Sequence, residues 1–72
     1  GITGQTEKAW QLFDAIIETD EKYADVWYYR GMLAMQVNDK SRLTASLKKF
    51  LQLSADGKKK KFVQNILENI SN

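Results

Sequence analysis

The side chains that most often do chemistry in proteins are scarce in this 72-residue chain. It contains no Cys and no His, which removes cysteine nucleophiles, thiolate metal ligands and the commonest general base. Asp14 and Glu18 form a carboxylate pair one helical turn apart, on a side expected to face solvent, where neither burial nor a shared site prepares them for acid–base work. No Gly-rich phosphate loop and no Asp-rich calcium loop is present. We therefore expect a protein that is not an enzyme and uses no cofactor or metal ion.

The most conspicuous charged run is formed by Lys58, Lys59, Lys60 and Lys61. On a helix, four consecutive residues point around most of the circumference, so they do not form one flat patch. Aromatic side chains are not interleaved with these lysines, as a stacking platform for nucleic acid requires. Solvation of an exposed helix is the usual explanation of such a run. The alternatives are an acidic protein partner, or a small basic helical module that binds nucleic acid or anionic surfaces through residues 40–61.

The composition indicates one small, all-helical domain. Hydrophobic residues make up 43% and charged residues 28% of the chain, and Pro is absent, which favours helices over disorder or a membrane protein. No apolar run is long enough to span a membrane, and no targeting segment is visible. The lack of Cys is compatible with both cytoplasm and periplasm, so the compartment is left open.

Charge is unevenly distributed along the chain. Residues 1–39 carry three basic and seven acidic side chains, a balance of −4, whereas residues 40–72 carry eight basic and two acidic ones, a balance of +6. Such a separation bears on association with partners rather than on the fold.

Apolar residues at three- and four-residue spacing predict four helices, over residues 6–18, 24–37, 40–53 and 58–70. The apolar stripes of the first, third and fourth helices are Ala9, Trp10, Leu12, Phe13, Ile16 and Ile17; Leu43, Leu47, Phe50 and Leu51; and Phe62, Val63, Ile66, Leu67 and Ile70. The connections are short, so neighbouring helices should run antiparallel. Polar turn residues mark these connections, with Asn38 ending the second helix and Asp39 or Ser41 capping the third.

Internal repetition distinguishes a closed four-helix bundle from a stack of helical hairpins. The segment Ala24–Gly57 is 34 residues long, with Trp27 and Gly31 four apart and Ala34 one turn later. Leu43, Leu47 and Phe50 follow in the next helix, and one period earlier stand Ala9, Phe13 and Ile16, preceded by Gly4. These residues and their spacing resemble the tetratricopeptide repeat (TPR) family.

The resemblance implies an all-α fold in which antiparallel helical hairpins stack as a right-handed superhelix. Residues 4–23 would be the second half of one repeat, residues 24–57 a full repeat, and residues 58–72 a C-terminal capping helix. The chain departs from the family at Glu21, where Pro is expected, at Arg30 in place of Leu, and at Leu43 in place of a small residue opposite Gly31. A self-contained four-helix bundle is the alternative.

The same alignment places Gly4 in the turn between the two helices of a hairpin. We therefore expect the chain to be the C-terminal fragment of a longer array, with an uncovered N-terminal face around Trp10 and Leu12. Alone, the chain would either shield this face by self-association or be only marginally stable. The alternative is that residues 1–5 are a cloning remnant on a complete domain.

In the resembling family, ligands lie in a concave groove lined by the first helix of each repeat. The matching positions here are Asp25, Tyr28, Tyr29, Met32, Met35 and Gln36. Tyr and Met suit a peptide with apolar anchors, which predicts a non-catalytic interaction or scaffolding module that binds a partner peptide or a neighbouring subunit. The Asn and Lys/Arg clamp for a terminal carboxylate is missing, since Arg30 does not stand at a clamp position. The alternative is that Tyr28, Met32 and Met35 merely pack against a neighbouring helix.

Overall fold

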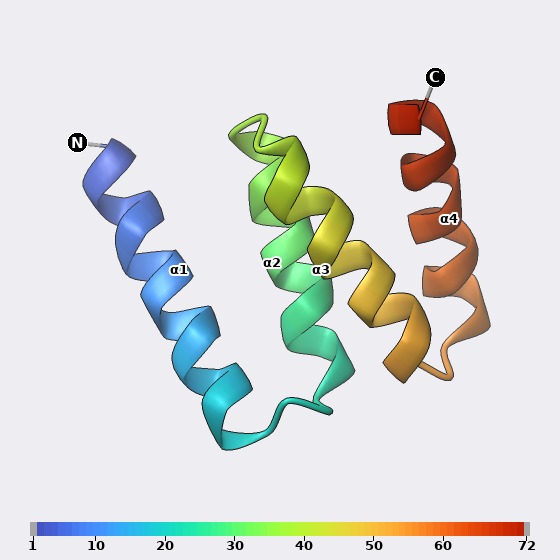
Figure 1. Cartoon of the computed structure of the whole chain (residues 1–72), viewed down its shortest axis with the longest axis horizontal. Coiled ribbons are helices and arrows are strands. Elements are labelled where there is room, and N and C mark those ends of the chain that lie inside the picture. The colour runs from blue at the N-terminus through green and yellow to red at the C-terminus, as the bar shows by residue number, and fades with distance from the viewer. Residues whose placement is uncertain (1, 72) are drawn as a thin grey trace.

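The fold is a row of four α-helices. The computed structural model describes residues 2–71 of the chain, and within them it contains α1 (Ile2–Thr19), α2 (Ala24–Gln36), α3 (Lys40–Leu53) and α4 (Gly57–Ser71), with no strand (Figure 1). The four predicted helices are thus confirmed, and the bounds of α3 are those expected from the sequence.

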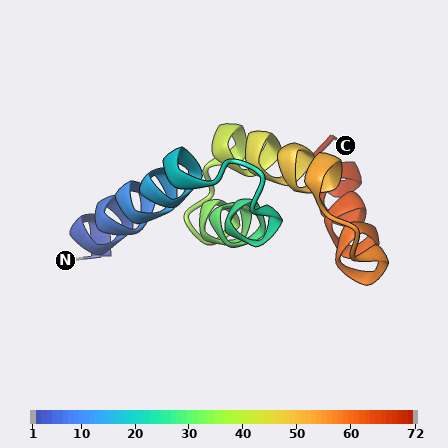
Figure 2. The same ribbon diagram turned by 90° about the horizontal axis from the view of Figure 1, so that it is seen from below.

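Only consecutive helices approach one another. Within the described residues, Cα atoms come within 8 Å between α1 and α2, between α2 and α3, and between α3 and α4, but not between α1 and α4. A view from below shows an arc with α2 on its inner side and α1 and α4 at its two ends (Figure 2). The extents of 33 × 30 × 16 Å describe a flat molecule. The helices therefore form an open row, and the closed bundle is wrong.

The ends of the helices are fixed by local backbone chemistry. Asn38 adopts a left-handed conformation (φ 60°), and the amide of Asp39 donates to the carbonyl of Ala34 at 2.8 Å, which is the Schellman arrangement that ends a helix. The Asp39 carboxylate then accepts from the amide of Arg42 at 3.1 Å and caps α3. Asp56 accepts from the first amides of α4 in the same way. The predicted turns are confirmed by these bonds.

The closest packing in the molecule is between α2 and α3. Gly31 is buried, and a Cβ atom placed there would collide with the side chain of Leu47. Gly31 therefore lets α2 and α3 approach closely. The residue opposite it is Leu47, and not Leu43 as the repeat pattern implies. The buried core around this contact comprises Trp10, Ala34, Leu43, Leu47, Phe50 and Val63.

Arg30 joins three helices. Its side chain is only 16% exposed, and its Nη1 donates to the Oγ of the fully buried Ser46 on α3 at 2.8 Å. Its Nε lies 3.4 Å from the carboxylate of Asp14 on α1, close enough for an ion pair but outside hydrogen-bond geometry. The guanidinium also lies over the rings of Trp10 and Trp27, at 5.4 and 5.9 Å from their centroids. Such stacking lets a charged group pack against aromatic side chains inside the fold.

Trp10 does not belong to an uncovered face, contrary to expectation. It is 3% exposed, because Arg42 on α3 also lies over its ring, 4.6 Å from the centroid, and Phe13 meets it edge-on. Leu12, in contrast, is 60% exposed as predicted. The N-terminal face expected around these two residues is therefore reduced to Leu12.

Two further predictions from the helical pattern are wrong. Gly4 lies inside α1, which begins at Ile2, so Gly4 is not in a turn between helices. Phe62 is 46% exposed although it belongs to the apolar stripe of α4, because Val63, Ile66 and Leu67 are the residues that turn toward α3. Trp27, in contrast, packs against the core as expected, and its indole donates to the carbonyl of Glu21 at 3.0 Å.

We predict that Gly31→Ala destabilises the protein. The added methyl group collides with Leu47, which is fully buried, so its side chain must shift within the core. Overpacking of this kind costs about 1–3 kcal/mol against a helix-propensity gain of at most about 1 kcal/mol. The free energy of unfolding in urea measures the change. Gly4→Ala is the matched control, since nothing lies within 4 Å of a Cβ there; equal or higher stability is expected for it. A Gly31→Ala protein as stable as the control would contradict the close approach.

We also predict that the two polar partners of Arg30 differ in importance. Ser46→Ala leaves a buried guanidinium N–H without its acceptor, which costs about 1–3 kcal/mol. Asp14→Asn removes an ion pair whose carboxylate is 59% exposed, and the change should stay below about 1 kcal/mol. Urea unfolding of both variants checks the ranking. A larger loss from Asp14→Asn would show that the ion pair, rather than the hydrogen bond, holds Arg30.

Candidate functional site

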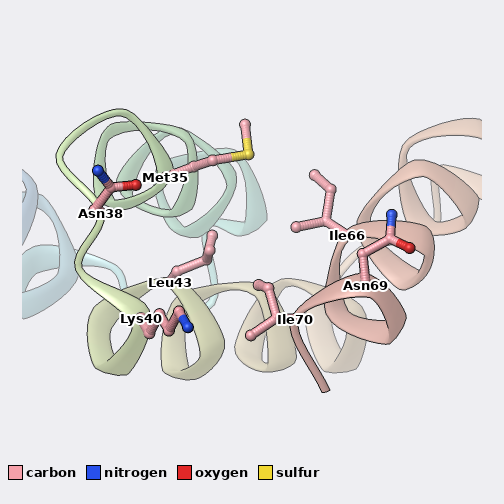
Figure 3. A pocket seen from close by; sticks show the side chains of 7 residues that line it. All are labelled: Met35, Asn38, Lys40, Leu43, Ile66, Asn69 and Ile70. Atoms are coloured by element: carbon pink, nitrogen blue, oxygen red, sulfur yellow. The ribbon is translucent and has the colours of Figure 1, made fainter. Parts of the chain in front are cut away.

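An open apolar hollow bordered by three helical segments lies between α2 and α4, with α3 as its floor. It encloses about 450 Å³, within the range of about 300–1,000 Å³ typical of ligand pockets. Met35 on α2 and Ile66 on α4 point toward one another across it, and Leu43 projects from α3 below Met35 (Figure 3). We call this hollow the α2–α4 groove; its lining is Met35, Asn38, Lys40, Leu43, Ile66, Asn69 and Ile70.

The groove is closed at one end and open at the other. Because α2 and α4 both run antiparallel to α3, their N-terminal ends lie on the same side of the molecule (Figure 1). There Lys59 pairs with Asp25 at 3.8 Å and lies over the ring of Tyr28, 5.3 Å from its centroid. Toward the C-terminal ends no such pair joins the two helices within the described residues, and the groove lies there.

A row of large side chains along α2 borders the groove. Tyr29 is 52% and Met35 is 41% exposed, which is high for an aromatic and a thioether side chain in a helix interior. We call the row of exposed and half-buried side chains along α2 the α2 ridge; it consists of Tyr29, Met32, Leu33, Met35 and Gln36. A shallow depression of about 450 Å³ lies between these side chains.

A second hollow lies on the other side of the α2 ridge, against α1. It encloses about 420 Å³ and is lined by Gln5, Thr6, Ala9, Leu33, Gln36 and Val37. Val37 is partly exposed there, at the end of α2. The inner side of the arc thus carries an apolar ridge with a hollow on each flank.

The structure separates the six groove residues predicted from the sequence into two groups. Four of them lie on the α2 ridge, and Met35 also lines the α2–α4 groove. Asp25 and Tyr28 are not among the residues that line these three hollows. They contact α4 and the core instead: Tyr28 packs on Phe50 with ring centroids 5.3 Å apart. Tyr28 thus packs against neighbouring helices, and Met32 also packs in part against the core.

The residues of the other wall and of the floor were not predicted from the sequence to line a groove. Lys40 and Leu43 come from α3, and Ile66, Asn69 and Ile70 from α4. A signal was present, since Ile66 and Ile70 belong to an apolar stripe that α3 covers only in part. The spacing of these apolar residues does not show which side of the stripe on α4 faces α2.

The basic run is divided between two environments. Lys59 is held by Asp25 and Tyr28, whereas Lys58 and Lys61 are exposed. The run therefore does not present its four ammonium groups to a common ligand.

Within residues 2–71, no three His, Cys, Asp or Glu side chains lie together in a way that could hold a metal ion. Among the helices described, none has the length and apolar character needed to cross a membrane.

No known protein provides a comparison for this groove. Comparison with protein families, with curated proteins and with solved structures finds no significant match to this chain.

Proposed function

We propose that this protein is a non-catalytic interaction module that binds a segment of a partner protein on the inner side of its arc. The observation that carries the proposal is the α2–α4 groove, a preformed hollow in which Met35 and Ile66 leave apolar surface open to solvent above the buried Leu43. Grooves between helices are a common way for proteins to bind the apolar face of a peptide or helix.

The total accessible surface supports a binding role. A monomeric protein of this mass is expected to expose about 4,600 Å², whereas the chain exposes 5092 Å². The excess arises from the open row, in which α2 is covered by neighbours on one side only. A partner that covered the inner side would bury a typical interface of about 800 Å² per protein.

We further propose that the row is a tetratricopeptide-like stack of hairpins. Two observations support this view. The last residues of α1 and α3, Thr19 and Leu53, are 34 positions apart, and the closest helix approach lies at Gly31. In such a stack α2 and α4 would be equivalent first helices of successive hairpins, and the groove between them would be the concave surface.

A selection experiment tests the proposed function. A phage-displayed library of random 16-residue peptides is panned against the immobilised chain and, in parallel, against Met35→Lys. We expect peptides with two or more large apolar residues to be enriched on the unchanged chain and to lose binding at least about tenfold on Met35→Lys, because a charge at the rim is placed where apolar anchors are buried. Fluorescence anisotropy with the synthesised peptides measures the affinities.

Ala45→Lys is the matched control for this experiment. Ala45 is an exposed residue of α3 that does not line the groove, so the added charge is the same but its position is not. If both variants bound the selected peptides as well as the unchanged chain, the groove would not be the binding site.

A salt titration tests the alternative of a basic module. We expect no binding to random duplex DNA at 0.1 M salt and protein concentrations up to about 100 μM, because the lysines that would contact phosphates are dispersed and one of them is already paired. Micromolar binding at low salt that is lost steeply as salt is added would favour the basic module over the peptide-binding function.

A further inference from the structure

The lining of the α2–α4 groove carries a net positive charge. Lys40 is its one charged residue, and no carboxylate lines the groove. The structure records no ion pair for Lys40 within the described residues, whereas Arg30, Arg42 and Lys59 each face a carboxylate within 4 Å. Lys40 is therefore a cation that pairs with no carboxylate among the described residues, and it lies beside an apolar surface.

The surroundings of Lys40 increase its attraction for an anion. Lys40 is the first residue of α3, whose end is already capped by the carboxylate of Asp39, and that carboxylate pairs with Arg42 at 3.2 Å and not with Lys40. The amides of Asn38 and Asn69 also line the groove (Figure 3) and can donate hydrogen bonds to a carboxylate. A partner that covers Leu43 and Ile66 would exclude water near Lys40, and the lower local dielectric would strengthen the attraction.

The spacing of the lining residues limits the partner further. Leu43 follows Lys40 by three positions on α3, and Ile70 follows Ile66 by four on α4, so each pair lies about one helical turn apart. A complementary segment would present an apolar side chain to Leu43 and Ile66 and a carboxylate about one turn away, opposite Lys40.

From this charge complementarity we propose that the groove binds an acidic amphipathic segment of another protein, with an Asp or Glu three or four positions from an apolar anchor. This inference rests on the proposed function and specifies the chemistry of the partner. The charge distribution of the chain agrees with it, because residues 40–72, which supply the floor and one wall, carry a balance of +6 and repel a basic segment.

The same peptide library tests this inference when it is panned against the unchanged chain, Lys40→Glu and Lys48→Glu. Glu is favourable at the start of a helix, so Lys40→Glu should fold. Lys48 is an exposed residue of α3 away from the groove, and its reversal gives the same net charge. Peptides selected on the unchanged chain should contain Asp or Glu one turn from an apolar anchor. They should bind Lys40→Glu about five- to tenfold more weakly and Lys48→Glu nearly unchanged.

The outcomes separate this inference from the proposed function. Enriched peptides without acidic residues, bound equally by Lys40→Glu, would overturn the acidic partner while leaving the groove as a binding site. No enrichment on the unchanged chain would instead overturn the proposed function. Sedimentation of the chain alone adds a further check, since a dimer that Lys40→Glu dissociates would identify a second copy, through its acidic N-terminal half, and not a different protein, as the occupant.

Discussion

The missing side chain at Gly31 is the constraint on which the arrangement of the helices depends. Because Leu47 occupies the space beside it, α2 and α3 approach more closely than any other pair, and this hairpin carries most of the buried core. The outer helices are each attached to one side of it, α1 through α2 and α4 through α3. A larger residue at position 31 would move α2 relative to α3, and both the groove and the α1 contact would change because they are built on that pair.

Arg30 explains how α1 is held although it meets only one other helix backbone. A buried guanidinium is costly to desolvate, and here the cost is offset by the Ser46 hydroxyl, by the Asp14 carboxylate and by the faces of two indole rings. Both Arg30 and Arg42 lie over the ring of Trp10, so this side chain of α1 makes cation–π contacts with α2 and α3. Leucine, the residue expected at position 30 from the repeat pattern, would fill space but could not link the three helices by polar contacts.

The parts of this structure that sequence could predict are the local ones. Helix ends follow from short-range bonds of Asn38, Asp39 and Asp56, and their types and positions are visible in the chain. The burial of Trp10 and the exposure of Phe62 were not predictable, because they depend on how each helix is rotated about its axis when it packs, and a stripe of apolar residues wider than one contact allows several rotations. For the same reason Met35, on the α2 wall of the groove, could be predicted as a groove residue, whereas Ile66, Asn69 and Ile70 of the α4 wall could not.

The composition of α2 shows how the open row leaves apolar surface exposed. This helix is apolar around most of its circumference: Val26 and Ala34 are buried, while Tyr29 and Met35 are large and exposed. A helix that is apolar all round is normally covered on all sides, yet the row leaves the inner side of α2 uncovered. In the folded chain α1 and α4 lie at opposite ends of the arc, and Tyr29 and Met35 stay exposed. The exposed apolar area on the inner side is therefore retained in the free protein, and its removal from water is the free energy available for binding.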